Sequence, residues 1–102
     1  MLSKMLTKTV LTPVDDFFLR LAQVIDRFRE PLNQLRKFKG RKPCKEAIKL
    51  QHNFFCCVKM HTRCSLRMAN VLAKHFFRGH GGKTENDREV IRRADDMLKT
   101  FA

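Results

Sequence analysis

Basic side chains recur along residues 45–74 of this 102-residue chain at steps that keep them on one side of a helix. No acidic residue lies between Glu46 and Glu85, whereas exposed helices usually mix both charge signs. Ammonium and guanidinium groups in a row bind phosphate oxygens, so the pattern predicts a nucleic-acid-binding face rather than a merely solvated one. The predicted contact residues are Lys45, Lys49, His52, Lys59, Arg63, Arg67, Asn70 and Lys74.

A second group of side chains has the spacing of a metal site. Cys57, His61 and Cys64 fall on one face of the same helix. That face is also the apolar face, where cysteine packs as a small hydrophobe, and the chain has no Cys-x-x-Cys pair. We therefore expect packing there, with no metal and no cofactor.

Residues for catalysis are few. The carboxylates lie where helix caps or solvated faces explain them, and no histidine has an acidic neighbour in its own helix. The sequence GHGGK at 79–83 lacks the spacing of a phosphate-binding P-loop. We expect neither an enzyme nor a small-molecule substrate.

The net charge of +12 is unevenly spread. Residues 1–83 hold 18 of the 22 Lys and Arg and 5 of the 10 Asp and Glu, a net +13, whereas residues 84–102 carry −1. The four cysteines fit no secreted disulfide framework, and no stretch approaches the roughly 20 apolar residues of a membrane span. This predicts a reduced, intracellular protein. An acid-poor segment at residues 1–11 leaves a mitochondrial presequence open, although it lacks arginine.

The elements that must position the basic residues are helices. Thr12 and Pro13 predict a helix start, and apolar residues recur at three- and four-residue steps until Gly40, with a kink or restart at Pro31. Pro43 opens a second helix that we expect to run unbroken to Gly79, some 36 residues or roughly 54 Å. Residues 84–101 form a third.

So long a rod cannot be covered by one shorter, kinked helix, which predicts a second copy of the chain. The expected fold is all-α, a helical hairpin that forms an antiparallel four-helix bundle as a homodimer. Its segments are an N-terminal extension (1–12), the hairpin (13–78), a glycine-rich hinge (79–83) and a C-terminal helix (84–102). That last helix could fold back on the bundle, pair with its twin or hold a separate partner. The expected dimer core is Phe17, Leu21, Phe28, Leu50, Phe54, Cys57, Cys64, Met68 and Leu72.

Along residues 18–76 the chain resembles the B2 proteins of insect nodaviruses. That family has an Asp-Arg pair after an apolar residue in its first helix. Its long second helix has a cysteine and, ten residues later, an Arg-Met pair followed by a leucine. The matching residues are Val24-Ile25-Asp26-Arg27-Phe28, Cys57, Arg67-Met68 and Leu72.

The resemblance implies a homodimer that lies along A-form double-stranded RNA without reading its sequence. Such proteins shield long duplexes from Dicer and sequester small interfering RNA, which suppresses host RNA silencing. Arg67 matches the family's principal RNA-contacting arginine, and Lys49 another basic contact. A family lysine falls on Met60, so Lys59 or Arg63 must substitute for it. The implied location is the host cytoplasm; association with mitochondria and contact with the host silencing machinery are left open.

Two alternatives remain. One is a basic structural RNA-binding protein of an organellar ribosome or ribonucleoprotein. The other is a helical module that docks on an acidic protein or a membrane surface.

Overall fold

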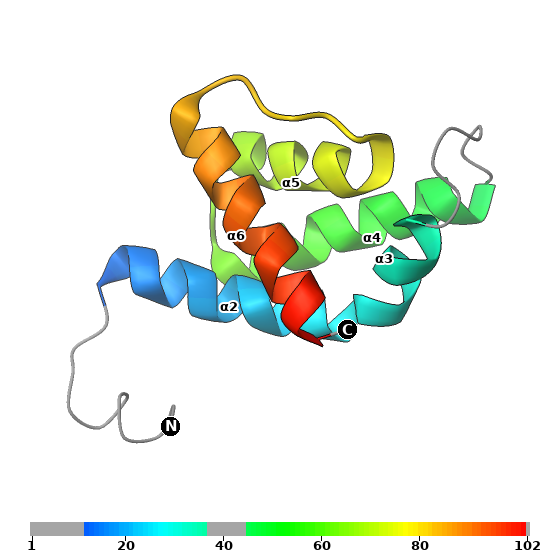
Figure 1. The fold of residues 1–102 in the computed structure, drawn as a ribbon, viewed down its shortest axis with the longest axis horizontal. Coiled ribbons are helices and arrows are strands. Elements are labelled where there is room, and N and C mark those ends of the chain that lie inside the picture. The colour runs from blue at the N-terminus through cyan, green and yellow to red at the C-terminus, as the bar shows by residue number, and fades with distance from the viewer. Residues whose placement is uncertain (1–11, 37–44, 102) are drawn as a thin grey trace.

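A computed structural model describes residues 12–36 and 45–101, and within these ranges the chain is helical with no strand. The all-α prediction is confirmed for these residues. The N-terminal extension up to residue 11, the stop at Gly40 and the start at Pro43 lie outside them. The helices are α2 (Pro13–Arg27), α3 (Arg29–Arg36), α4 (Lys45–Thr62), α5 (Leu66–Arg78) and α6 (Glu85–Phe101) (Figure 1).

The first predicted helix begins as expected and breaks earlier than expected. The backbone N–H of Asp15 donates to Oγ1 of Thr12 at 3.1 Å, which caps α2. The helix ends at Arg27, with Phe28 as its C-cap, whereas the sequence predicted the kink at Pro31. Pro31 instead lies in the first turn of α3, where its missing N–H leaves no helical hydrogen bond unmade.

The second predicted helix is not continuous, so that prediction is wrong. At its break, Oγ1 of Thr62 donates to the carbonyl of Val58 at 2.6 Å and accepts from the N–H of Cys64 at 3.3 Å. Arg63 has a φ of 59°, in the left-handed region that ends a helix. Ser65 then caps α5 by accepting from the N–H of Met68 at 3.1 Å.

This break turns the expected rod into a hairpin, in which α5 runs back alongside α4 (Figure 1). In this hairpin the ring of Phe54 is in contact with three other phenylalanine rings. Its centroid lies 5.3 Å from that of Phe28, 5.6 Å from Phe76 and 5.8 Å from Phe77. The apolar face of α5 therefore packs on α4 and not on a second chain, and the premise that a long rod needs a partner fails. The homodimer itself stays a prediction.

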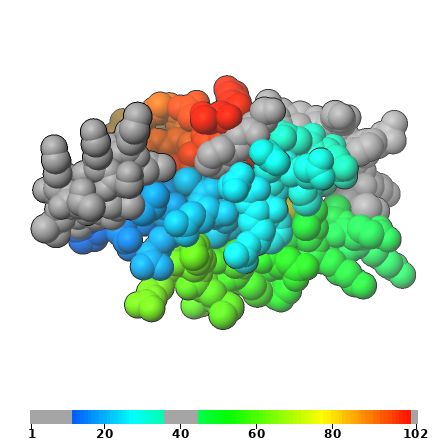
Figure 2. Space-filling view, turned by 90° about the horizontal axis from the view of Figure 1, so that it is seen from below, coloured from blue at the N-terminus to red at the C-terminus, as the bar shows by residue number. Residues whose placement is uncertain are grey.

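The residues predicted as dimer core form the core of one chain. Leu21, Phe54 and Leu72 are fully buried, and Leu50 is half-buried. Partly buried against that core are Phe17, Phe28, Cys57, Cys64 and Met68. In the space-filling view α2 lies directly against α4, and this contact covers the core side chains between the two helices (Figure 2).

The C-terminal helix packs on its own chain, which was one of the three possibilities that the sequence left open. Its apolar stripe is buried against α2 and α5, and consists of Val90, Ile91, Ala94 and Leu98. The guanidinium of Arg93 lies 4.5 Å from the ring centroid of Phe18, a further contact between α6 and α2.

Two glycines determine the backbone conformation of the segment between α5 and α6. Gly79 ends α5 with a φ of 74°. Gly82 has a φ of 80°, and a Cβ there would lie 2.8 Å from Cβ of Asp87 and 3.1 Å from Cδ1 of Ile91. Gly82 is therefore required both by its backbone conformation and by its close approach to α6.

We predict that Gly82→Ala lowers the free energy of unfolding by more than about 1 kcal/mol, because alanine is strained at positive φ and its Cβ collides with Asp87. Gly81→Ala is the matched control, since a Cβ there meets nothing within 4 Å. Urea denaturation of both variants checks this. Equal stability of the two would contradict the packing described for Gly82.

Candidate nucleic-acid interface

Five of the predicted contact residues lie together along the outer side of α4. Lys45, Lys49, His52 and Lys59 are exposed on the helix, and Arg63 is exposed immediately after it. We call these five residues the α4 stripe. At about 100° per residue, the four helical members lie within roughly 80° of one another and opposite the buried Phe54. The helix thus separates its core side from its cationic side.

The lysines of the α4 stripe are available to a ligand. Among the described residues no carboxylate pairs with the ammonium groups of Lys45, Lys49 or Lys59. The imidazole of His52 differs from these lysines, because its Nε2 lies 3.5 Å from Sγ of Cys56 in the same helix. From Lys45 to Lys59 the stripe is about 21 Å long, enough to lie along several phosphates of a duplex.

The other three predicted contact residues lie elsewhere, which corrects the prediction of one continuous face. Arg67, Asn70 and Lys74 are exposed on α5, beyond the break in the helix. They line a cavity of about 660 Å³, whose other side is formed by residues 80–83 and Asp87. The predicted contact residues therefore form two groups, the α4 stripe and the α5 residues that line the cavity.

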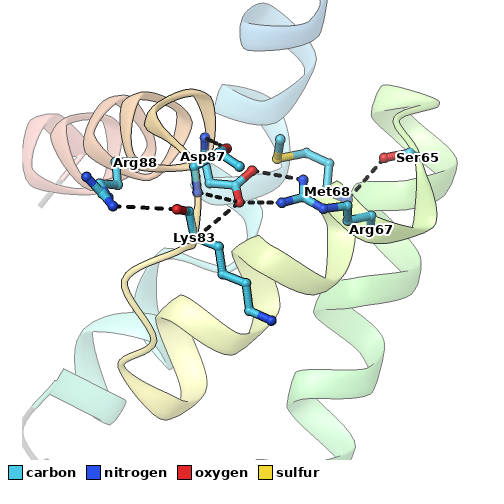
Figure 3. A network of polar contacts seen from close by, with 7 residues as sticks. Ser65, Arg67, Met68, Lys83, Asp87 and Arg88 are labelled. Carbon is cyan, nitrogen blue, oxygen red and sulfur yellow. Dashed lines mark hydrogen bonds and ion pairs between the residues drawn. The ribbon is translucent and has the colours of Figure 1, made fainter.

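Arg67 is already paired. Its Nη1 donates to Oδ1 of Asp87 at 2.9 Å, and its Nη2 donates to Oδ2 at 2.6 Å. The Asp87 side chain is 1% exposed and that of Arg67 is 56% exposed. The backbone N–H groups of Lys83 and Thr84 also donate to Oδ2 of Asp87, and the N–H of Asp87 donates to Oγ1 of Thr84 (Figure 3). Thr84 and Asp87 thus form a capping box at the start of α6.

This network keeps the buried carboxylate of Asp87 ionised. The hydrogen bonds from Arg67 hold the pKa of Asp87 well below its usual range, against the opposing effect of burial, and the N–H groups of Lys83 and Thr84 act in the same direction as Arg67. The same hydrogen bond raises the pKa of Arg67. Both groups are charged at neutral pH, so Asp87 neutralises an arginine that the sequence predicted to contact RNA. Arg67 is therefore paired within its own chain, and its contact with RNA stays a prediction.

The side chains with metal-site spacing have other neighbours. Nε2 of His61 lies 2.5 Å from Oε1 of Gln23, and Nη1 of Arg27 donates to Sγ of Cys57 at 3.8 Å. Cys64 packs partly buried against the core. Within residues 12–36 and 45–101, no three His, Cys, Asp or Glu side chains form a cluster able to hold a metal ion.

Three residues outside the predicted contact set belong to the cavity beside α5: His80, Lys83 and Asp87. His80 and Lys83 line the cavity beside α5, and Asp87 fixes its rim. A signal for Asp87 was present, because Thr84-x-x-Asp87 has the spacing of a capping box. No sequence signal indicated the pairing of Asp87 with Arg67, because 20 residues and a glycine-rich segment separate the two.

No protein-family model, curated protein sequence or solved structure matches this chain. None of the helices in the described ranges has both the length and the apolar character needed to cross a membrane.

We predict that Asp87→Asn lowers the free energy of unfolding at neutral pH by about 1–3 kcal/mol, because Arg67 and two backbone N–H groups lose a buried carboxylate. The folded-state pKa of Asp87 is depressed, so its stabilisation is complete above the ordinary Asp pKa of about 3.9 and fades as the pH falls below it. Urea denaturation at several pH values measures the difference from the unchanged protein.

Asp96→Asn is the control for that experiment, because Asp96 is 58% exposed and its carboxylate pairs only at the surface, with Arg92. The stabilisation is lost progressively between the ordinary Asp pKa and the depressed folded-state pKa, so a stability difference for Asp87→Asn that stayed the same from neutral pH down to about pH 2 would contradict the role assigned to the carboxylate.

Proposed function

We propose that this protein binds double-stranded RNA through the α4 stripe without reading its base sequence. The observation that carries the proposal is the row of exposed cations on one side of α4, whose three lysines have no carboxylate partner among the described residues. A straight helix of 18 residues presents these charges along a line, as a rigid duplex presents its phosphates.

The choice of a duplex over a single strand rests on the aromatic residues. Binding of single strands depends on bases stacking on exposed aromatic rings, and the chain has no Trp or Tyr. All seven phenylalanines whose side chains are described are in the core or pack against it: Phe17, Phe18, Phe28, Phe54, Phe55, Phe76 and Phe77.

The choice of RNA over DNA follows from groove shape. An A-form duplex has a deep, narrow major groove that side chains do not enter, so proteins bind its phosphates and the 2′-hydroxyl groups across the shallow minor groove. Lysines on a convex helix suit that kind of contact and carry no base-reading geometry. Sequence-independent binding is therefore the expected mode.

The biological role rests on the resemblance to nodavirus B2 proteins. We propose that the protein shields long duplex RNA from Dicer and sequesters small interfering RNA in the host cytoplasm, and so suppresses RNA silencing. A protein that ignores sequence suits this role, because silencing must be blocked for every duplex that the host cuts.

The homodimer is part of the same proposal. It rests on the resemblance alone, because a single chain already buries Leu21, Phe54 and Leu72, and their burial needs no second chain. The large apolar side chains left exposed for an interface include Ile48, Met60 and Leu66. Sedimentation equilibrium of the purified chain is expected to give the mass of a dimer. A monomer that still bound duplex RNA would contradict the dimer and leave the α4 stripe in place.

We predict that Lys49→Ala and Lys59→Ala each weaken binding to duplex RNA without changing stability, since both side chains are exposed and belong to the α4 stripe. Each variant is expected to reduce the slope of log affinity against log salt by about 1, the change for one lost phosphate contact. Filter binding over a series of salt concentrations measures the slope.

Lys99→Ala is the control, because Lys99 is an exposed lysine in the last turn of α6, outside the α4 stripe. Its slope should equal that of the unchanged protein. If all three variants lost affinity equally, the binding would reflect net charge alone and the assignment to α4 would be wrong. Arg67→Ala is not a clean test, because it leaves the carboxylate of Asp87 buried and unpaired.

A further inference from the structure

The cavity beside α5 is a concave site that duplex binding by α4 does not use. Its α5 wall consists of Arg67, Asn70, Val71 and Lys74, and its other wall consists of residues 80–83 with Asp87. Its volume of about 660 Å³ lies within the range of sites that hold small molecules, roughly 300–1,000 Å³. A duplex cannot enter such a space, whereas a single phosphate group or a nucleotide can.

The charges that line the cavity leave a surplus of two cations. Arg67 and Asp87 form an ion pair and cancel. Lys74 and Lys83 are both exposed, and no carboxylate among the described residues pairs with either ammonium group. Figure 3 shows the Lys83 side chain extending from the segment before α6 toward α5. Both lysines line the cavity, Lys74 in the α5 wall and Lys83 in the other wall.

The neutral groups of the cavity suit the same kind of ligand. Asn70 and His80 contribute an amide and an imidazole that can donate hydrogen bonds, and Val71 contributes an apolar surface. Gly81 and Gly82 bring bare backbone to the cavity, so that a ligand can approach the main chain closely. The ion pair between Arg67 and Asp87 joins α5 to the start of α6 and so links the two walls of the cavity.

We propose that this cavity binds a phosphate monoester, either a free nucleotide or the terminal phosphate of an RNA strand. A monoester carries a charge close to −2 at neutral pH, which matches the two unpaired ammonium groups, whereas a phosphodiester carries −1. The proposal is independent of duplex binding by the α4 stripe, because the two sites share no residue.

The test is an NMR titration of the ¹⁵N-labelled full chain at constant ionic strength, with three probes that differ in phosphate charge. They are adenosine 5′-monophosphate, cyclic adenosine monophosphate, which is a diester, and adenosine. The monoester is expected to give saturable shifts at the amides of Gly81, Gly82 and Lys83, with weaker shifts for the diester and none for adenosine. Absence of saturable shifts at these amides with the monoester would overturn the proposal, as would equal affinity for all three probes.

Variants locate the site. Lys74→Gln combined with Lys83→Gln is expected to weaken monoester binding by about tenfold or more, because two charge-assisted contacts are lost. Lys49→Gln combined with Lys59→Gln makes the same charge change on the α4 stripe and should leave monoester binding within about twofold. An equal loss in both double variants would overturn the proposal, whatever either variant does to duplex binding.

Duplex RNA with 5′-phosphate or 5′-hydroxyl ends distinguishes the two sources of the monoester. Tighter binding of the phosphorylated duplex, lost in the Lys74 and Lys83 double variant, assigns the cavity to RNA strand ends. Equal binding of the two duplexes, together with saturable binding of the nucleotide, assigns it to a free monoester.

Discussion

The carboxylate of Asp87 is buried, and the arrangement of the C-terminal half of the molecule depends on how its charge is satisfied. Arg67 from α5 binds both of its oxygens, while the N–H groups of Lys83 and Thr84 bind one of them. A buried carboxylate without such partners would cost several kcal/mol, so the helix that carries Arg67 and the segment before α6 must meet at this point. This meeting fixes the turn at Gly82, sets α6 on the core and defines the cavity beside α5.

The same pairing divides the cations of the chain into two kinds. On α4 they stand on a convex helix opposite the core and suit a partner with an extended row of charge. Beside α5 they line the cavity, where Asp87 neutralises Arg67, and where Lys74 and Lys83 have no carboxylate partner among the described residues. A protein of high positive charge therefore need not bind all anions in one way. Under the two proposals, shape separates the ligands: a duplex lies along the α4 stripe, and a single phosphate group enters the cavity.

The sequence predicted the elements whose signals are local and missed what depends on contacts between distant residues. Thr12 and Pro13 marked the start of α2 correctly, and Gly79 marked the end of α5. The break after Thr62 was missed because the apolar repeat continues through it without Gly or Pro; Ser65, three residues before Met68, was the available cue. All eight predicted contact residues are exposed. Their division between α4 and the cavity follows from that break and from the pairing of Arg67 with Asp87. Helical periodicity describes positions within one helix and so cannot predict a contact between two helices.

The central claim, sequence-independent binding of duplex RNA, is tested most directly by a gel-shift comparison at physiological salt. The purified chain is incubated with an RNA duplex of about 25 base pairs, longer than the roughly 16 base pairs that one double-stranded-RNA-binding domain spans, with a DNA duplex of the same sequence and with single-stranded RNA. Physiological salt is needed because low salt lets any basic protein bind. We expect selective retention of the RNA duplex, unchanged when its base sequence is scrambled. Equal binding of all three nucleic acids would contradict it and leave only a polycation.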